Sequence, residues 1–324
     1  MYTSETTAKS MNQTSTVSLG KNGPQVTALG VGTWSWGDRL FWDYGKEYDQ
    51  TEVRDAFAAS VEAGVTLFDT AEVYGLGESE RLLGTFVQEK TTPCAIATKY
   101  FPLPWRIFPQ AVEDALSDSL ERLQVESIPL YQVHMPFSFF MNQETLMDTL
   151  AKEVKRGRIE AVGVSNYSAS QMREAQEQLA KRGVTLASNQ VPYSLLNRKI
   201  ERNGVWQTAQ ELEVTIIAYS PLAQGLLTGK YTGQEQPSGA RRLDPKFKSS
   251  GINEVSPVIN TLRKLAEKYQ KTPAQIALNW LITQGTIPIP GAKNADQAQQ
   301  NAGALGWQLD LEDAQELERV SRPW

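Results

Sequence analysis

Residues 51–70 read "TEVRDAFAASVEAGVTLFDT", and this stretch contains both kinds of segment from which the rest of the chain is built. The first part, 51–64, places apolar residues at helical intervals and ends at a glycine, as helices commonly do. The second part, 66–70, is a short apolar run that closes on polar residues, which is typical of a buried strand. The stretch therefore predicts a helix followed directly by a strand.

The same alternation continues along the chain after a small hairpin. Residues 17–29, "VSLGKNGPQVTAL", hold two short strand-like runs around Asn-Gly and Gly-Pro, which predicts that hairpin. Amphipathic segments then separate eight apolar runs, which are "LGVG" (29–32), "TLFDT" (66–70), "CAIATK" (94–99), "LYQVH" (130–134), "AVGVS" (161–165), "LASNQV" (186–191), "TIIAYS" (215–220) and "IPIPG" (287–291). Helices that cover a parallel sheet on both faces produce this pattern. We predict a single (β/α)8 TIM-barrel domain over residues 17–324.

An open doubly wound sheet is the alternative fold. Its usual marker is G-x-G-x-x-G after the first strand, but "GVGTWS" (30–35) has Ser35 in place of the third glycine, which favours the barrel. Two segments depart from the alternation. We expect a long polar loop over residues 222–254, and "LEDAQELERV" (311–320) predicts an extra C-terminal helix.

The composition limits the classes of function. The net charge of −5 argues against nucleic acid or an anionic membrane as a partner. Cys94 is the single cysteine and His134 the single histidine, so there is no internal disulfide, and we expect no metal site. No apolar run approaches the ~18 residues of a membrane helix. Residues 1–16 lack the apolar region of a secretory signal, and we expect a disordered tail on a cytoplasmic monomer or weak homo-oligomer.

Polar residues close six of the eight apolar runs. They are Asp69, Lys99, His134, Ser165 with Asn166, Gln190, and Tyr219 with Ser220. The carboxyl ends of the strands in a parallel barrel open on one face, where active sites lie. A lone histidine at the end of one run is more often structural, and Ser165 or Asn166 could simply cap a helix. Six neighbouring polar ends together predict a site.

Adjacent strands of a sheet lie about 4.8 Å apart. The second, third and fourth strands end at Asp69, Lys99 and His134, so these three side chains would lie close together. Asp69 would neutralise Lys99, and the loop "AEVYGLGE" would fold Tyr74 over both. The ammonium would lower the pKa of the Tyr74 hydroxyl, which could then protonate an oxygen that gains negative charge. His134 would hydrogen-bond the same oxygen. A hydrolase that pairs Asp69 with Glu72 remains an alternative, because two carboxylates perform glycoside hydrolysis.

Seven motifs that follow one another along the chain resemble those of the aldo-keto reductase superfamily. They are "FDTAEVYG" (68–75), "ATKY" (97–100), "LYQVHMP" (130–136), "VGVSNYS" (162–168), "SNQVPYS" (188–194), "AYSPLAQGLLTGKY" (218–231) and "IPIPGAKN" (287–294). The chain looks most like the pyridoxal-reductase-like oxidoreductases of plant plastids and cyanobacteria, and more distantly like potassium-channel β subunits. The resemblance implies an NADPH-dependent reductase of aldehydes or ketones, with NADH less favoured. It also implies that Tyr74 is the general acid, that Asp69 and Lys99 tune it, and that His134 orients the carbonyl.

The resemblance further implies a cofactor site. Its residues would be Thr33, Trp34, Asp69, Ser165, Asn166, Gln190, Tyr219, Ser220, Pro221, Leu222, Gln224, Gly225, Lys230, Arg241, Gly291, Lys293, Gln297 and Asn301. Ser165, Asn166 and Gln190 would bind the nicotinamide carboxamide. Gln297 stands where many members carry arginine, so Lys293 is the cation left for the 2′-phosphate of NADPH.

Aromatic residues crowd the loops after the first, third and fourth apolar runs. Trp34, Trp105 and Phe137 are predicted to line a substrate pocket that favours aryl or longer-chain carbonyl compounds. The same residues would fit packing between loops or a dimer contact equally well. A barrel that holds NADPH as a redox sensor with little turnover, like the channel β subunits, also remains open.

Overall fold

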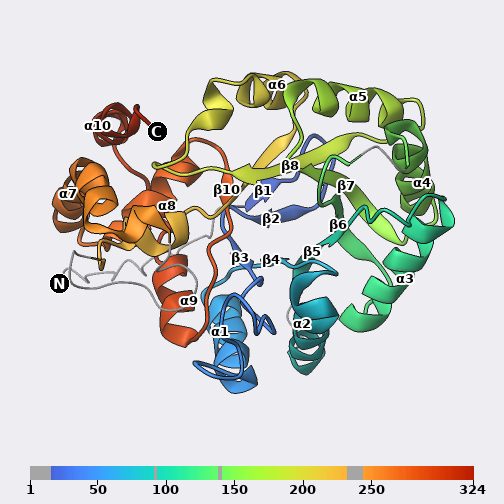
Figure 1. Cartoon of the computed structure of the whole chain (residues 1–324), viewed down its shortest axis with the longest axis horizontal. Coiled ribbons are helices and arrows are strands. Elements are labelled where there is room, and N and C mark those ends of the chain that lie inside the picture. The colour runs from blue at the N-terminus through green and yellow to red at the C-terminus, as the bar shows by residue number, and fades with distance from the viewer. Residues whose placement is uncertain (1–15, 91–92, 138–140, 232–243) are drawn as a thin grey trace, which may run out of the picture.

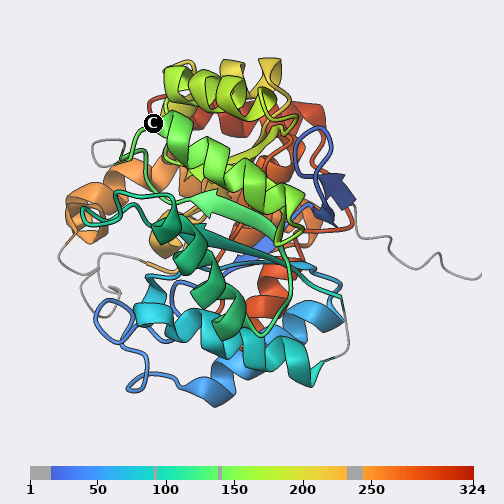
Figure 2. The ribbon, with the colours of Figure 1, turned by 90° about the vertical axis from the view of Figure 1, so that its right-hand side faces the viewer.

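The structure is a computed structural model, and the part of the chain that it describes begins with the hairpin. The described residues are 16–90, 93–137, 141–231 and 244–324. Strands β1 (Thr16–Ser18) and β2 (Gln25–Thr27) pair antiparallel, as predicted (Figure 2). Thr16 already belongs to β1, so the tail predicted over residues 1–16 is too long by that residue. The rest of that predicted tail lies outside the described residues.

The predicted barrel strands are parallel and neighbour one another in chain order (Figure 1). They are β3 (Gly30–Gly32), β4 (Leu67–Asp69), β5 (Ala95–Tyr100), β6 (Ile128–Val133), β7 (Ile159–Ser165), β8 (Leu186–Pro192), β9 (Thr215–Tyr219) and β10 (Ile287–Pro288). The barrel closes where Gly32 bridges Gly291, just beyond β10. A Cβ atom on Gly32 would lie 2.9 Å from the carbonyl oxygen of Ile289, so a side chain there would push the first and last strands apart. The (β/α)8 barrel is confirmed.

Helices follow the strands and surround the barrel (Figure 1). They are α1 (Gln50–Glu62), α2 (Glu78–Glu89), α3 (Gln110–Leu123), α4 (Gln143–Lys155), α5 (Ala169–Ala180), α6 (Val205–Glu211), α8 (Pro273–Thr283) and α9 (Ala295–Ala302), with the short 3-10 helices η1 (Tyr74–Gly77), η2 (Lys199–Glu201), η3 (Ala223–Thr228) and η5 (Pro245–Phe247). Local sequence fixes several starts. Asp49, Ser168 and Thr272 each begin a helix with a capping box, which satisfies backbone N–H groups that the first turn leaves without partners.

Two further helices lie outside the barrel and pack against one another (Figure 1). One is α10 (Leu311–Ser321), the predicted C-terminal helix. The other is α7 (Ser249–Tyr269), which was not predicted, because the polar loop was expected to run through residue 254. Polar residues at its start and Pro257 in its interior obscure the helical pattern, although the buried apolar residues beyond the proline recur at helical spacing.

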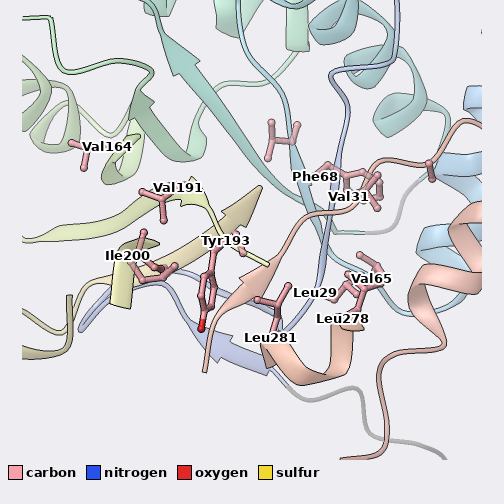
Figure 3. Close-up of a cluster of buried hydrophobic side chains, with 14 of the residues drawn as sticks. Leu29, Val31, Val65, Phe68, Val164, Val191, Tyr193, Ile200, Leu278 and Leu281 are labelled. Atoms are coloured by element: carbon pink, nitrogen blue, oxygen red, sulfur yellow. The ribbon is translucent and has the colours of Figure 1, made fainter. Parts of the chain in front are cut away.

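The barrel wall separates two apolar cores. The larger core lies between strands and helices, and Figure 3 shows part of it, including Phe68, Val164 and Val191. The smaller core fills the amino end of the barrel, where Leu19 and Val26 of the hairpin segment pack against residues of the strands. The polar strand ends therefore gather at the opposite, carboxyl end, above an apolar plug.

Candidate active site

A buried ion pair forms the base of the site at the ends of β4 and β5. The Lys99 ammonium donates to Oδ2 of Asp69 at 2.6 Å and to the carbonyl of Thr70 at 2.6 Å, and the lysine side chain is fully buried. Burial opposes the charged form of Lys99, but Asp69 and then Tyr74 outweigh it, so the pKa of the lysine is raised. Lys99 therefore stays charged at neutral pH.

Two glutamines complete the surroundings of Asp69. Its Oδ1 accepts from the side-chain amide of Gln190 at 2.6 Å and from that of Gln132 at 3.2 Å. Gln132 was not predicted, although it is the polar residue inside the apolar run "LYQVH". Thr33, a predicted cofactor residue, is fully buried and donates to the backbone carbonyl of Asp69. It does not line the cavity and instead supports the aspartate.

Tyr74 reaches the same point from η1, the loop after β4. Its hydroxyl oxygen lies 3.3 Å from the Lys99 ammonium, which also lies 4.8 Å from the centre of the phenol ring. Burial raises the pKa of Tyr74 and outweighs the lowering by Lys99. This differs from the sequence-based expectation of a lowered pKa, which took no account of burial. Tyr74 consequently holds its proton at neutral pH.

His134 follows directly after β6, where its backbone N–H donates to the carbonyl of Tyr100. Its ring lies edge-on to those of Tyr74 and Phe101, with centroids 5.7 and 5.4 Å apart. Nδ1 is buried and has no hydrogen-bond partner among the described residues. Burial, and then Lys99, lowers the pKa of His134 to about 3. The imidazole is therefore neutral and can donate a hydrogen bond, but it is not the acid at neutral pH.

Three polar side chains form a chain of hydrogen bonds beside this cluster, which ends on a backbone carbonyl. Tyr219 donates to the amide oxygen of Asn166 at 3.0 Å, and the Asn166 amide nitrogen donates to Oγ of Ser165 at 3.0 Å. Ser165 in turn donates to the backbone carbonyl of Gln190. Asn166 has a left-handed backbone with φ of 63°, a conformation that asparagine tolerates better than most residues. These bonds fix an array of amide and hydroxyl groups next to Tyr74.

A cavity of about 1320 Å³ opens above these residues. The predicted residues that line it are Trp34, Asp69, Tyr74, His134, Ser165, Asn166, Gln190, Tyr219, Ser220, Pro221, Leu222, Gln224, Gly225, Lys230, Gly291, Lys293, Gln297 and Asn301. Ordinary small-ligand pockets measure about 300–1,000 Å³, so this cavity has room for a dinucleotide together with a substrate. Ser220, Ala223 and Gln224 have left-handed backbones, and such strain is concentrated at ligand-binding loops.

Two lysines of the described chain line the same cavity. The Lys293 ammonium donates to the carbonyl of Trp42, lies 4.2 Å from the centre of the Tyr48 ring, and is 3.8 Å from a carboxylate oxygen of Glu47. Lys230 lies over the ring of a neighbouring tyrosine. Both cations suit phosphate groups. Arg241, the third predicted cation, lies outside the described residues.

The aromatic residues predicted for the substrate pocket lie in different places. Trp34 lines the cavity and stacks on Phe41. Phe137 contacts Phe101, which lines the cavity, but Phe137 itself does not line it. Trp105 is 72% exposed and also lies outside the lining. Phe101 was missed by the sequence analysis, although it immediately follows a strand that ends in a polar residue.

Glu72, the second carboxylate of the hydrolase alternative, is bound elsewhere. It accepts two hydrogen bonds from the Arg106 guanidinium and one from the backbone N–H of Phe101. It does not line the cavity, so it is not placed to act as the second carboxylate with Asp69. Within the described ranges, no cluster of potential metal ligands is present, and no helix is long and apolar enough to cross a membrane.

A (β/α)8 barrel with a buried lysine–aspartate pair, a tyrosine and a histidine beside one large cavity fits the class of oxidoreductases that the motifs resemble. Comparison with known proteins gives the family. The model of the Aldo/keto reductase family matches residues 28–322, and the chain belongs to that family.

Relatives agree with this assignment. The chain is 38% identical over 315 residues to the chloroplastic pyridoxal reductase of Arabidopsis thaliana, covering 93% of this chain and 85% of that protein. A glycerol dehydrogenase from Gluconobacter oxydans superposes with a TM-score of 0.82 at 28% identity, over 94% of each chain. An aldo/keto reductase from Klebsiella pneumoniae, solved with NADP and acetate, superposes with a TM-score of 0.73 at 26% identity, over 94% and 95% of the two chains. The resemblance stated from the motifs is confirmed.

Proposed function

We propose that this protein reduces aldehydes or ketones to alcohols with NADPH. The observation that carries the proposal is the 3.3 Å contact between the Tyr74 hydroxyl and the charged Lys99 at the floor of the cavity, with a neutral His134 beside them. A protonated phenol next to a fixed ammonium is suited to protonate an oxygen on which negative charge develops.

The residues around the cavity fit a nicotinamide dinucleotide. Asn166, Ser165 and Gln190 would hold the carboxamide, and Lys230 and Lys293, which line the same cavity, would pair with phosphates. When bound, the reduced nicotinamide supplies the hydride that the carbonyl carbon accepts. The solved Klebsiella relative that contains NADP supports the choice of cofactor.

The protein's own residues would supply the proton and the orientation. His134, which is neutral, donates a hydrogen bond from a ring N–H to the carbonyl oxygen and turns it toward Tyr74. Tyr74 transfers its hydroxyl proton to that oxygen, and Lys99 stabilises the phenolate that remains. Asp69 holds the ammonium in place throughout.

The substrates we propose are aromatic or otherwise apolar carbonyl compounds. Trp34, Phe101 and Met135 line the cavity beside the catalytic residues. The pyridoxal reductase relative is compatible with an aromatic aldehyde as substrate. The test follows the absorbance of reduced nicotinamide with purified protein, NADPH and a panel of aromatic aldehydes. Tight NADPH binding without turnover would favour the redox-sensing alternative, and absence of nicotinamide binding would contradict both.

Replacement of Lys293 by methionine should raise the dissociation constant of NADPH at least about tenfold and change that of NADH far less, because a hydrogen bond to a charged group contributes about 1.5–3 kcal/mol. Lys293→Met is compared with Lys230→Met, whose expected effect is similar for both cofactors because Lys230 would bind a phosphate that they share. Titration of the bound nicotinamide fluorescence measures the four constants. Equal losses for both cofactors in Lys293→Met would contradict a role at the 2′-phosphate.

In His134→Ala we expect KM for an aromatic aldehyde to rise about tenfold, with a smaller fall in kcat, because one hydrogen bond that orients the carbonyl is lost. Since the pKa of His134 is about 3, the wild-type profile should show no limb from this histidine between about pH 5 and 8. Steady-state kinetics across that range measure both. A wild-type limb in that range that disappears in His134→Ala would show that the histidine titrates there.

A further inference from the structure

Glu72 and Arg106 form an ion pair behind the wall of the cavity. Glu72 lies just before Tyr74 in the loop after β4, and Arg106 lies in the loop after β5. The guanidinium donates to Oε1 of Glu72 at 2.5 Å and to Oε2 at 2.9 Å, and the side chains are only 7% and 18% exposed. A bidentate pair of this kind fixes geometry as well as charge, so it sets the relative position of the two loops.

The same pair binds both polar groups of one backbone residue. The N–H of Phe101 donates to Oε1 of Glu72 at 2.6 Å, and Arg106 donates to the carbonyl of Phe101 at 2.9 Å. We call the pair Glu72–Arg106 the clamp. The Phe101 backbone cannot rotate without breaking hydrogen bonds to this clamp. The Phe101 ring lines the cavity and lies edge-on to His134.

We propose that the Glu72–Arg106 clamp is a positioning unit that holds the Phe101 ring beside His134 and keeps water away from the buried Nδ1 side of that imidazole. The clamp residues do not line the cavity, so they act through Phe101 and are positioning residues. The kinetic part of this inference rests on the proposed carbonyl reduction. The structural part, which is the cover over His134, does not depend on it.

The groups around His134 make the cover measurable. The titratable groups that face it are Lys99 from β5, with Asp69 paired behind it, and Tyr74 from η1. From the end of β7, Asn166 donates its amide to the carbonyl of His134, and it does not titrate. Burial is the largest cause of the lowered pKa of His134, and Lys99 is the second.

A loss of the Phe101 cover and a loss of the Glu72 charge would shift the pKa of His134 in opposite directions. Removing the negative charge of Glu72 would by itself disfavour the imidazolium and lower the pKa further. Water admitted beside the ring would favour the imidazolium and raise the pKa. A rise in Glu72→Gln therefore reports hydration of the site rather than the missing charge.

The single histidine of the chain allows a direct experiment on the full-length, untagged protein. In Glu72→Gln, we expect the pKa of His134, followed by NMR titration, to rise by at least about one unit toward its ordinary value. We also expect KM for an aromatic aldehyde to rise about tenfold, with a smaller change in kcat, because the wall that positions the substrate has loosened. Phe101→Ala should reproduce the rise in the pKa.

The matched control is Glu80→Gln. Glu80 pairs with Arg122 at 2.7 Å, with exposures of 0% and 18%, and joins α2 to α3 without lining the cavity. Glu80→Gln should lower the free energy of unfolding, because it breaks a buried ion pair, and should leave the pKa of His134 unchanged. If Glu72→Gln does not fold, Arg106→Lys, which keeps the charge and loses the fork, is measured in its place. A His134 pKa and a KM equal to those of Glu80→Gln would overturn the clamp. A wild type without carbonyl turnover would contradict the proposed function, and the NMR titration would still decide on the clamp.

Discussion

Tyr74→Phe is expected to lower kcat for carbonyl reduction about 10³-fold, because general acid catalysis contributes about 10²–10⁴ and no other suitable acid lies at this point among the described residues. Lys99 stays charged and cannot replace the phenol efficiently, since Asp69 and the carbonyl of Thr70 hold two of its N–H groups. His134 is neutral, and in the proposed mechanism it donates a hydrogen bond rather than the proton. The dissociation constant of NADPH should remain unchanged, which separates a catalytic loss from a binding loss. Stopped-flow kinetics and fluorescence titration measure the two quantities.

The matched control for this substitution is Tyr131→Phe. Tyr131 is also fully buried, belongs to β6 and packs in the larger core between strands and helices, and its hydroxyl has no hydrogen-bond partner among the described residues. Removing this hydroxyl should leave kcat close to wild type. If Tyr74→Phe kept kcat within a factor of ten of Tyr131→Phe, the proton would have to come from another group.

The residues at the carboxyl ends of the strands could be predicted from sequence, because in a parallel barrel the end of each apolar run lies on the same face. Asp69, Lys99 and His134 lie far apart in the chain, yet each closes an apolar run, and parallel strands bring such positions to one face. Tyr74 follows one of those ends closely, so only a short loop had to be placed. The catalytic roles of these residues remain predictions that the kinetic experiments test.

The residues that sequence analysis placed less well depend on contacts between loops. Glu72 was weighed as a hydrolase carboxylate because its partner Arg106 belongs to a different loop, and no spacing in the sequence joins them. Trp105 is of the residue type that commonly lines an apolar pocket, but in the structure its side chain is exposed to solvent. The raised pKa of Tyr74 likewise depends on burial, which the residue types alone do not give.

Lys99→Met should combine the largest loss of stability with a loss of activity. The substitution leaves the buried Asp69 carboxylate with the amides of Gln132 and Gln190 as its side-chain donors within the described part of the chain, and removing one partner of a buried pair costs about 3–5 kcal/mol. It also removes the charge that, in the proposed mechanism, would stabilise the Tyr74 phenolate, so we expect kcat to fall at least about 10³-fold. Urea unfolding and single-turnover kinetics measure the two effects.

The double variant Asp69→Asn/Lys99→Met separates these two effects, because it replaces the ion pair by neutral groups of similar shape. Its free energy of unfolding should recover most of the loss in Lys99→Met, while kcat stays low, since the phenolate still lacks its ammonium. The pKa of Lys99 is raised above 10.5 in the folded protein, so the stability from its charge is fully present below pH 10.5 and is lost as the pH rises through the raised value. On the alkaline side, the wild type should therefore begin to lose stability relative to the double variant above that pH. A double variant as unstable as Lys99→Met would show that the lysine contributes packing rather than compensation of the buried carboxylate.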